Sequence, residues 1–223
     1  MYICRSYIRK LDDTVMLVLP MPFKKLHPQI KEKLEDFEIT TPTPFQIKSI
    51  PVIKSGANIY CTAPENSGKT TTLILTTLNK LKCEEVGTAP RALVLVKDNQ
   101  TALELYDAFY KYTRSTTLRV YFGDEKQHIE LLKSEIFEGI DILISTPKVA
   151  SKLLLLEGLN TTQLKIFSID DADFLTRTAS SADIMAITQS IHKCQFVIYS
   201  EKMHPTLKRF ESYFMQYAKT VAL

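Results

Sequence analysis

Short apolar runs alternate with amphipathic segments along most of the chain, and this alternation predicts its secondary structure. Each run has about the length of a buried strand, is rich in Val, Ile, Leu, Tyr and Phe, and lacks the polar alternation of a half-exposed strand. We therefore expect strands that are covered on both faces. The runs lie at residues 57–62, 91–96, 118–122, 140–145, 165–169 and 194–199, and a seventh strand is expected to begin at Val221.

Segments with helical spacing fill the intervals between these runs. The spacing is clear before the first strand, where Ile30, Leu34 and Phe37 recur on one face. Strands and helices in alternation predict an α/β fold, with a mostly parallel sheet, helices on both faces, and ligands at the carboxyl ends of the strands. The expected helices span residues 27–37, 44–54, 70–82, 100–113, 125–137, 147–156, 181–192 and 204–218.

Organised sequence begins near Met21, which is also a candidate translation start. Residues 21–223 contain no repeat, low-complexity stretch or linker, so we predict a single domain there and a weakly ordered extension at residues 1–20. The apolar stretch at residues 15–19 is too short to span a membrane, and no small-residue cleavage site follows it. We therefore expect neither a membrane anchor nor a signal peptide.

The composition indicates a globular protein with a mild positive charge. The 223 residues are 45% hydrophobic, which suffices for a packed core, and a net charge of +3 permits nucleic-acid binding without demonstrating it. The four cysteines lie far apart and form no Cys-x-x-Cys pair, so we expect reduced thiols and a cytoplasmic location. The four histidines lack ligand spacing, which argues against a metal site built from protein side chains alone.

The loop between the first strand and the helix after it has the features of a phosphate-binding loop, or P-loop. Backbone N–H groups at a helix start, together with the positive end of the helix dipole, can cradle a triphosphate. Lys69 would reach the outer phosphates, and the Thr70 hydroxyl would help to hold Mg²⁺. The plainer alternative is a turn that caps a helix, with Lys69 merely solvated. The loop residues are Ala63, Pro64, Glu65, Asn66, Ser67, Gly68, Lys69 and Thr70.

An acidic segment after a later strand supplies the second half of the expected site. A P-loop needs a carboxylate on a neighbouring strand to hold the metal, normally through water because Mg²⁺ dehydrates reluctantly. Asp170 directly follows the run at residues 165–169 and would face Thr70. Asp171 is the candidate that orients or deprotonates the attacking water. The alternative is that these acids only cap the next helix.

Five segments in a fixed order carry a resemblance to a known family. They are residues 42–46 (Pro-Thr-Pro-Phe-Gln), residues 63–70, Gly123, residues 145–147 (Ser-Thr-Pro) and residues 170–173 (Asp-Asp-Ala-Asp). In that order they are similar to the Q motif, the AxTGSGKT loop, the Gly pair, the Thr-Pro-Gly-Arg segment and the Asp-Glu-Ala-Asp motif of DEAD-box ATP-dependent RNA helicases. Over about residues 23–223 the chain resembles the first RecA-like domain of that family.

The resemblance implies a role for each matching residue. Gln46 would read the adenine edge, since a side-chain amide can donate and accept at once, and this implies ATP with Mg²⁺ as the cofactors. Lys69 and Asp171 would be catalytic, and Thr70 and Asp170 would hold the metal, mostly through water. Nucleotide-binding residues are implied at Phe23, Gln46 and residues 63–70. RNA-binding residues are implied at Lys97, Asn99, Gly123, Thr146 and Lys148.

Four departures from the family motifs bear on the nucleotide site. Asn66 replaces a Gly inside the phosphate loop, and Asn tolerates positive φ better than most residues, so nucleotide binding can survive. Glu65 places a carboxylate near phosphates, which is unfavourable unless it points away. Asp171 is one methylene shorter than the family's Glu, and a displacement of about 1 Å can lower the rate roughly a hundredfold. Ile39 lies where the family tends to carry an aromatic side chain, which weakens stacking on adenine.

Other departures bear on RNA. Asn99 lies where an Arg normally meets the RNA backbone, and Lys148-Val149 replaces the family's Gly-Arg. Lys97 and Lys148 restore charge only as point charges, without the bidentate bonds of arginine. Residues 200–202, Ser-Glu-Lys, replace the Ser-Ala-Thr segment that links the ATP site to strand separation. Nothing resembles the second RecA-like domain and its arginine finger, worth about 10³–10⁵ in rate, so unwinding by this chain alone is not expected.

These features predict an ATP-binding, DEAD-box helicase-like domain with weak ATP hydrolysis and weak, sequence-independent RNA binding. A second RecA-like domain or a ribonucleoprotein in trans is the protein partner that this interpretation allows, and no membrane partner is expected. The alternative class is a catalytically inert, helicase-derived adaptor that binds RNA or protein partners. In that class Lys69 and Thr70 are a relic or a nucleotide-gated switch. A third alternative is RNA binding without nucleotide dependence.

Overall fold

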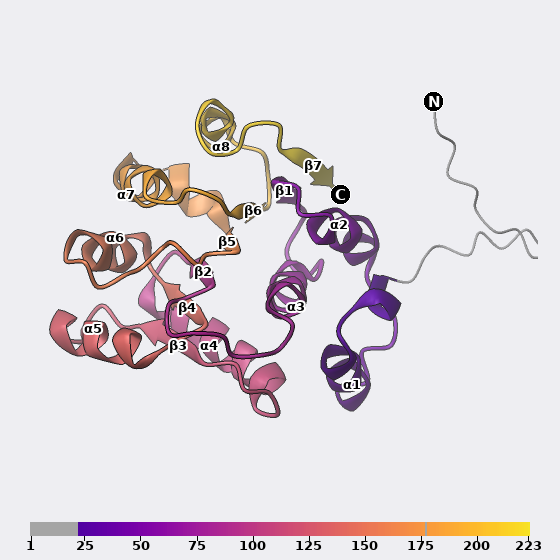
Figure 1. Ribbon diagram of the computed structural model, residues 1–223. Helices are drawn as coiled ribbons and strands as arrows, with labels where there is room; N and C mark the ends of the chain where they lie inside the picture. Colours follow the sequence, from indigo (N-terminus) through magenta and orange to yellow (C-terminus); the bar gives the residue numbers. More distant parts are fainter. Residues whose placement is uncertain (1–21, 177) are drawn as a thin grey trace, which may run out of the picture.

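A parallel sheet lies between two layers of helices in the computed structural model, which describes residues 22–176 and 178–223 (Figure 1). The predicted extension at residues 1–20 lies outside the described residues. The strands are β1 (Ile59–Thr62), β2 (Ala92–Leu95), β3 (Val120–Gly123), β4 (Ile142–Ser145), β5 (Ile166–Ile169), β6 (Gln195–Ser200) and β7 (Lys219–Ala222). The α-helices are α1 (Pro28–Asp36), α2 (Pro44–Lys54), α3 (Lys69–Leu81), α4 (Asn99–Thr113), α5 (Ile129–Glu138), α6 (Pro147–Leu155), α7 (Thr178–Gln189) and α8 (Pro205–Arg209). Short 3₁₀ helices lie at Pro22–Lys25, Ala172–Thr176 and Phe210–Ser212.

Within the described residues the seven strands form one sheet in the order β3-β4-β2-β5-β6-β1-β7, and every pairing is parallel. The five central strands are buried along their whole length, as the continuous apolar runs predict, whereas the edge strands β3 and β7 are partly exposed. Because all strands run the same way, their carboxyl ends lie at one edge of the sheet. The α/β fold prediction is therefore confirmed.

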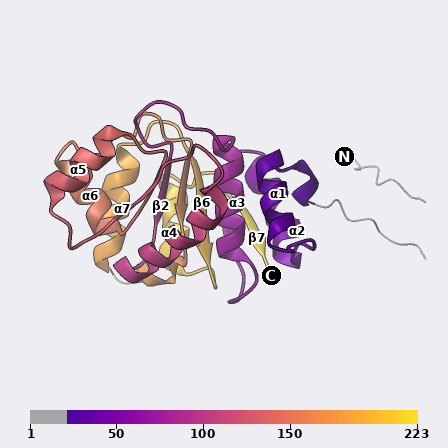
Figure 2. The ribbon, with the colours of Figure 1, turned by 90° about the horizontal axis from the view of Figure 1, so that it is seen from below.

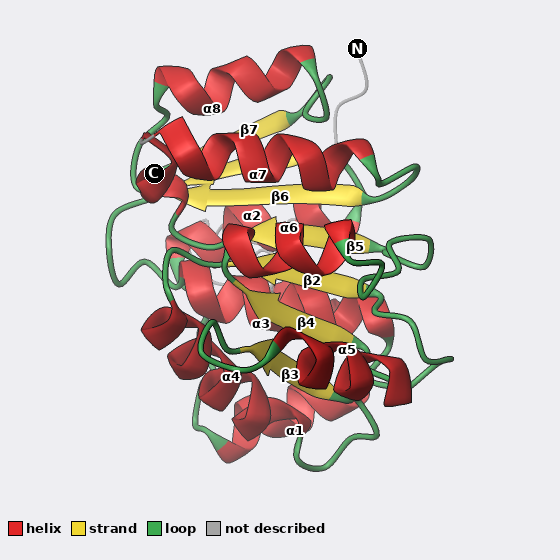
Figure 3. Cartoon of the chain, turned by 90° about the vertical axis from the view of Figure 1, so that its left-hand side faces the viewer, coloured by secondary structure: helices red, strands yellow, loops and turns green. Residues whose placement is uncertain are grey.

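Helices α1 to α4 cover one face of the sheet and α5 to α8 cover the other (Figures 1 and 3). Side chains alternate between two cores because successive residues of a strand point to opposite faces. In β1, Ile59 and Cys61 pack into the core under α1 to α4, and Tyr60 packs into the core under α5 to α8. No helix in the described part of the chain is long and apolar enough to cross a membrane.

Helices α1 and α2 lie outside α3, which itself rests on the sheet (Figure 2). The backbone N–H of His27, just before α1, donates to the Asn79 side chain of α3 over 3.0 Å. Thr43, the N-cap of α2, donates from its hydroxyl to the Ser67 carbonyl over 2.7 Å. The start of helix α2 is therefore hydrogen-bonded to the loop that precedes α3.

Two predicted helix boundaries were wrong. Helix α5 begins at Ile129 rather than at residue 125, because Asp124 and Gln127 close a turn in which the Gln127 N–H donates to the Asp124 carbonyl. The helix expected over residues 204–218 ends as α-helix at Arg209. Beyond it, Phe210 and Phe214 pack on each other and extend the core, and β7 begins at Lys219 rather than at Val221.

The cysteines in the described residues are free thiols. Cys61 and Cys83 are buried, and Cys194 is partly buried. Burial raises the pKa of the Cys83 thiol to about 11 and that of the Cys194 thiol to about 12, so both are protonated at neutral pH.

A fully buried carboxylate, Asp141, ties the amino ends of β2, β3 and β4 together. Its Oδ1 accepts from Arg91 Nε over 3.0 Å and Nη2 over 2.6 Å, and its Oδ2 accepts from Arg119 Nε over 3.0 Å. Burial opposes ionisation, but the bonds from Arg119 and Arg91 outweigh it and hold the pKa of Asp141 below its usual value. This cluster lies at the sheet edge opposite the strand carboxyl ends.

Replacing Asp141 by Asn is expected to lower the free energy of unfolding by about 3–5 kcal/mol at pH 7, because Arg91 stays buried without its counter-charge. Urea unfolding measures the change. Glu130→Gln, which removes the acid of the more exposed pair with Lys133, is the control and should change stability by less than about 1 kcal/mol. Since the pKa of Asp141 is lowered in the folded state, the greater stability of the wild type is fully present above about pH 4 and shrinks as the pH falls through the folded-state pKa. Equal losses of stability in the two variants would contradict this role for Asp141.

Candidate functional site

A cavity of about 500 Å³ opens at the carboxyl ends of β1, β5 and β6, where the sequence predicts the nucleotide site. It combines residues of the phosphate loop, the first turn of α3, and the segments that follow β5 and β6. The cavity therefore brings together side chains that lie more than 100 residues apart in the sequence. Its lining residues are Glu65, Asn66, Gly68, Lys69, Thr70, Thr71, Thr101, Asp170, Asp171 and Glu201.

Two residues of the phosphate loop have left-handed backbone conformations. Asn66 has φ 57° and Gly68 has φ 93°, so position 66 does need the conformation that the sequence comparison indicated. Gly68 is also crowded, because a Cβ atom there would lie 2.8 Å from Gln46 Nε2. Glycine is therefore required at position 68 both by the positive φ and by the close contact with Gln46. Position 66 needs only the positive φ, which Asn adopts more readily than most other residues.

Lys69 opens α3 and folds back over the loop. Its ammonium donates to the Ala63 carbonyl over 2.5 Å and to the Pro64 carbonyl over 2.8 Å. Both acceptors are neutral backbone oxygens, and the side chain is only half-buried. A phosphate oxygen would be a stronger, charged acceptor for the same donor, so the ammonium can exchange these bonds for an anion.

Thr70 and Asp170 meet across the cavity. The Thr70 hydroxyl donates to Asp170 Oδ2 over 3.4 Å, although the two residues are 100 positions apart. Burial, and then the neighbouring charge of Asp171, raise the pKa of Asp170 to about 6, against the opposing effects of Thr70 and Lys69. A carboxylate held in this way gains from a nearby cation, which is the requirement of a metal-binding group.

Asp171 stands directly after Asp170, with φ 51°. Burial and the charge of Asp173 raise the pKa of Asp171. Asp173 itself does not line the cavity: its Oδ2 accepts from the Glu201 N–H over 2.7 Å, and its Oδ1 lies 2.9 Å from His204 Nε2. The acidic segment after β5 is thus joined directly to the segment after β6.

The two residues predicted to contact the base do not line this cavity, although Gln46 lies directly beside Gly68, which does. Gln46 is buried and forms a capping box at the start of α2, where its Oε1 accepts from the Thr43 N–H over 2.9 Å. Phe23 is buried in the core under α1 to α4. The structure therefore gives both residues structural contacts, and their contact with adenine stays a prediction.

The charged side chains of the cavity suit the magnesium complex of a triphosphate better than the bare triphosphate. Lys69 shares the cavity with four acidic residues, Glu65, Asp170, Asp171 and Glu201. A bare triphosphate would meet an excess of negative charge, whereas its magnesium complex would not. In the described residues no group of three or more His, Cys, Asp or Glu side chains could hold a metal by itself, so Thr70 and Asp170 would hold Mg²⁺ together with phosphate oxygens and water.

The predicted RNA-binding residues lie at the carboxyl ends of the neighbouring strands β2, β3 and β4. Lys97 and Lys148 are exposed, Asn99 opens α4, Gly123 ends β3, and Thr146 caps α6. Gly123 is closely packed, since a Cβ atom there would lie 3.1 Å from a methyl group of Val149. These positions therefore lie at neighbouring strand ends beside the cavity, with Lys97 and Lys148 exposed and Gly123 and Thr146 buried.

Sequence reasoning missed some residues of this region. Thr101 and Glu201 line the cavity, and Glu125 lies among the RNA-binding candidates and bonds to Thr146 over 2.7 Å. Residue 125 was assigned to a helix and treated as helix surface. The signal that could have found it is Asp124, since Asp favours a turn directly after a strand.

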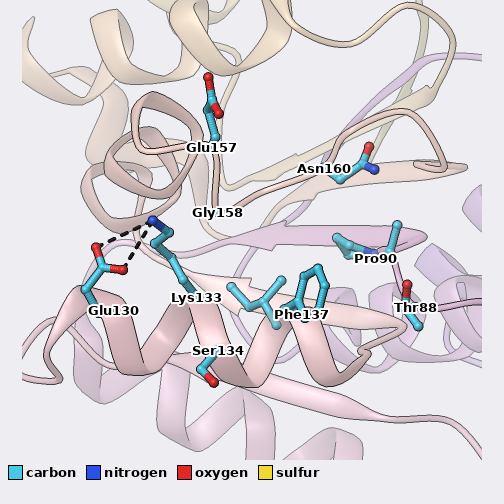
Figure 4. Close-up of a pocket in the computed structure, with 11 residues that line it drawn as sticks. Thr88, Pro90, Glu130, Lys133, Ser134, Phe137, Glu157, Gly158 and Asn160 are labelled. Atoms are coloured by element: carbon cyan, nitrogen blue, oxygen red, sulfur yellow. Dashed lines mark hydrogen bonds and ion pairs between the residues drawn. The ribbon is translucent and has the colours of Figure 1, made fainter.

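A second cavity of about 430 Å³ lies at the opposite edge of the sheet, between α5 and the loops before β2 and β5 (Figure 4). Phe137 and Pro90 lie side by side in its wall, and Lys133 pairs with Glu130 over 3.3 Å. It shares no lining residue with the first cavity. None of the predicted nucleotide-site residues lines this second cavity.

The fold and the phosphate loop at the start of α3 define a RecA-like P-loop domain. A family model described as DEAD/DEAH box helicase matches residues 43–209, and the chain belongs to that family. It is 27% identical over 206 residues to the ATP-dependent RNA helicase DeaD of Buchnera aphidicola, an alignment that covers 90% of this chain and 33% of that protein. It is 30% identical over 192 residues to the probable ATP-dependent RNA helicase ddx27 of Dictyostelium discoideum, covering 82% and 24%. The chain thus spans a third or less of these relatives.

Solved structures share the fold. A DEAD box protein from the hyperthermophile Methanococcus jannaschii superposes with a TM-score of 0.81 at 18% identity, over 89% of this chain and 54% of that one. A Saccharomyces cerevisiae Dbp5 variant, solved with Nup159, a Gle1 variant, IP6 and ADP, gives a TM-score of 0.76 at 17% identity, over 89% and 52%. At these identities the likeness concerns the fold alone.

Replacing Asp170 by Asn is expected to stabilise the protein at pH 7.5 by about 1–3 kcal/mol, because the variant avoids ionising a buried carboxyl group. The folded-state pKa is raised above the unfolded value near 4, so the wild type loses stability as the pH rises through about 6. The gain should therefore disappear near pH 4. Urea unfolding at the two pH values measures it, with the exposed Asp107→Asn as control; a variant that is no more stable than the wild type at pH 7.5 would contradict the burial cost.

Proposed function

We propose that this chain is an ATP-binding, DEAD-box helicase-like domain with weak, magnesium-dependent ATP hydrolysis and weak, sequence-independent RNA binding. The observation that carries the proposal is the convergence of Lys69, Thr70 and Asp170 on one cavity at the start of α3. Backbone N–H groups and the dipole of α3 add positive potential at the same point. Relatives in the family are named ATP-dependent RNA helicases, which supports the same function.

Each residue then has a defined task. Lys69 exchanges its bonds to the Ala63 and Pro64 carbonyls for a phosphate oxygen. Thr70 and Asp170 hold the metal, which would neutralise charge on the phosphates. Asp171 orients the attacking water, and burial beside Asp173 raises its pKa, which makes its carboxylate a stronger base. ATP itself follows from the family rather than from an observed base contact.

Full activity is proposed to require a second RecA-like domain. The chain spans 33% of the DeaD relative and about half of each solved structure, so the activity proposed here is that of this domain alone. An arginine finger from such a domain typically adds about 10³–10⁵ in rate. The single domain is therefore expected to turn over slowly and to separate RNA strands only with a partner domain.

An inert adaptor is the second candidate function, and one observation favours it. Four acidic residues line the same cavity as Lys69, whose ammonium already has two backbone partners. If these interactions exclude the nucleotide, the fold would serve to bind RNA or a protein partner without turnover. The two functions differ in whether magnesium-ATP binds.

Lys69→Ala should weaken magnesium-ATP binding by about 10- to 100-fold, because one charge-assisted bond to phosphate is lost. Calorimetry measures the affinity, and a thermal shift serves as a second readout, since ATP at about 100 times its dissociation constant adds roughly 2.7 kcal/mol of stability. Lys31→Ala on α1 is the control with the same change in charge. Wild-type protein that fails to bind magnesium-ATP would favour the adaptor instead.

Asp171→Asn should leave magnesium-ATP affinity within about twofold and lower turnover by roughly 10²–10⁴, the usual value of general base catalysis. Asn tolerates the left-handed backbone at position 171, so the variant removes the charge without straining the loop. Phosphate release under single-turnover conditions separates the two effects. Unchanged turnover would exclude Asp171 as the group that positions water.

A further inference from the structure

Glu125 occupies the middle of the surface formed by the carboxyl ends of β2, β3 and β4. Its side-chain Oε1 accepts from the Thr146 hydroxyl over 2.7 Å, and its backbone N–H donates to Asn99 Oδ1 over 3.0 Å. Thr146 and Asn99 open α6 and α4, the helices that follow β4 and β2. Glu125, which lies in the loop after β3, therefore bonds to the segments that follow β4 and β2.

These bonds use the polar groups that a phosphate would need. The Thr146 hydroxyl has a single proton, and it points to the Glu125 carboxylate. Its oxygen accepts from the Val149 N–H at the start of α6, so its bonding capacity is largely filled. A phosphate oxygen that binds at this helix start must therefore displace the carboxylate from Thr146.

The charge of Glu125 opposes an anion at the same place. The helix starts of α4 and α6 and the exposed side chains of Lys97 and Lys148 attract phosphate, whereas a carboxylate between them repels it. Glu125 is exposed, lies before the first turn of α5, and holds Thr146 through a single side-chain bond. Its side chain can therefore rotate away without disturbing the helix.

We propose that Glu125 limits the affinity of this region for RNA: its carboxylate, bonded to Thr146, occupies the position of a backbone phosphate and must rotate away before RNA binds. The inference rests on the proposed RNA binding and adds a residue that limits its strength. Removing the carboxylate should strengthen binding to any single-stranded RNA equally, because the repulsion concerns the phosphate backbone and not the bases.

The test is RNA affinity measured by fluorescence anisotropy with a labelled ten-nucleotide oligouridylate, at low and high salt and without nucleotide. Glu125→Gln keeps an acceptor for Thr146 but removes the charge, and Glu125→Ala also frees the hydroxyl. Both should bind about three- to tenfold more tightly than the wild type at 50 mM salt, and the gain should fall toward unity at 0.5 M as the charge is screened. Glu138→Gln, at the far end of α5, is the control with the same charge change and should have the wild-type affinity.

The outcomes separate this inference from the function on which it rests. If the wild type binds RNA and Glu125→Gln binds it equally well, the inference is overturned and RNA binding stands. If no variant binds, including Glu125→Lys, both are overturned. A gain that persists undiminished at 0.5 M salt would show a change in loop structure rather than in charge, and would also overturn the inference. Thermal melts of all variants establish that each is folded.

Discussion

Parallel strand pairing is the constraint on which this site depends. Every pairing in the sheet is parallel, so each strand delivers its carboxyl end, and the helix that follows it, to the same edge. That geometry brings Thr70 within 3.4 Å of Asp170 from 100 residues away. It also gathers the positive ends of α3, α4 and α6 at one edge of the protein. An anion-binding surface follows from topology before any particular side chain is considered.

The side chains at this edge of the sheet place positive and negative charges close together. Asp170 is buried at the cost of a raised pKa, and Lys69 satisfies its ammonium with backbone carbonyls. Neither arrangement is the most stable one for its group, since a buried carboxylate gains from a cation and an ammonium gains from an anion. The two cores on either face of the sheet hold these groups in place. Stability and function are therefore in conflict at Asp170, as they often are at binding sites.

Much of the fold could be predicted because the buried strands appear in the sequence as continuous apolar runs, and the apolar residues of the helices recur with helical spacing. Lys69 and Thr70 lie at the start of α3 and Asp170 directly follows β5, at the positions that their motifs predict relative to the preceding strands. Boundaries failed where packing or turn geometry decides, as at Phe214, which joins the second core instead of extending a helix. The contacts of Glu125 could not be predicted either. They join loops that are distant in the sequence and meet only because β2, β3 and β4 end at the same edge of the sheet.

The left-handed backbone at Asn66 also bears on how this sequence can drift. With φ 57°, position 66 accepts Asn or Gly, tolerates Asp, and excludes β-branched residues whatever their chemistry. A single replacement by Gly would relax the backbone further at the expense of a more disordered unfolded chain. The backbone conformation at position 66 therefore restricts which residues can stand there more than the chemistry of the side chain does.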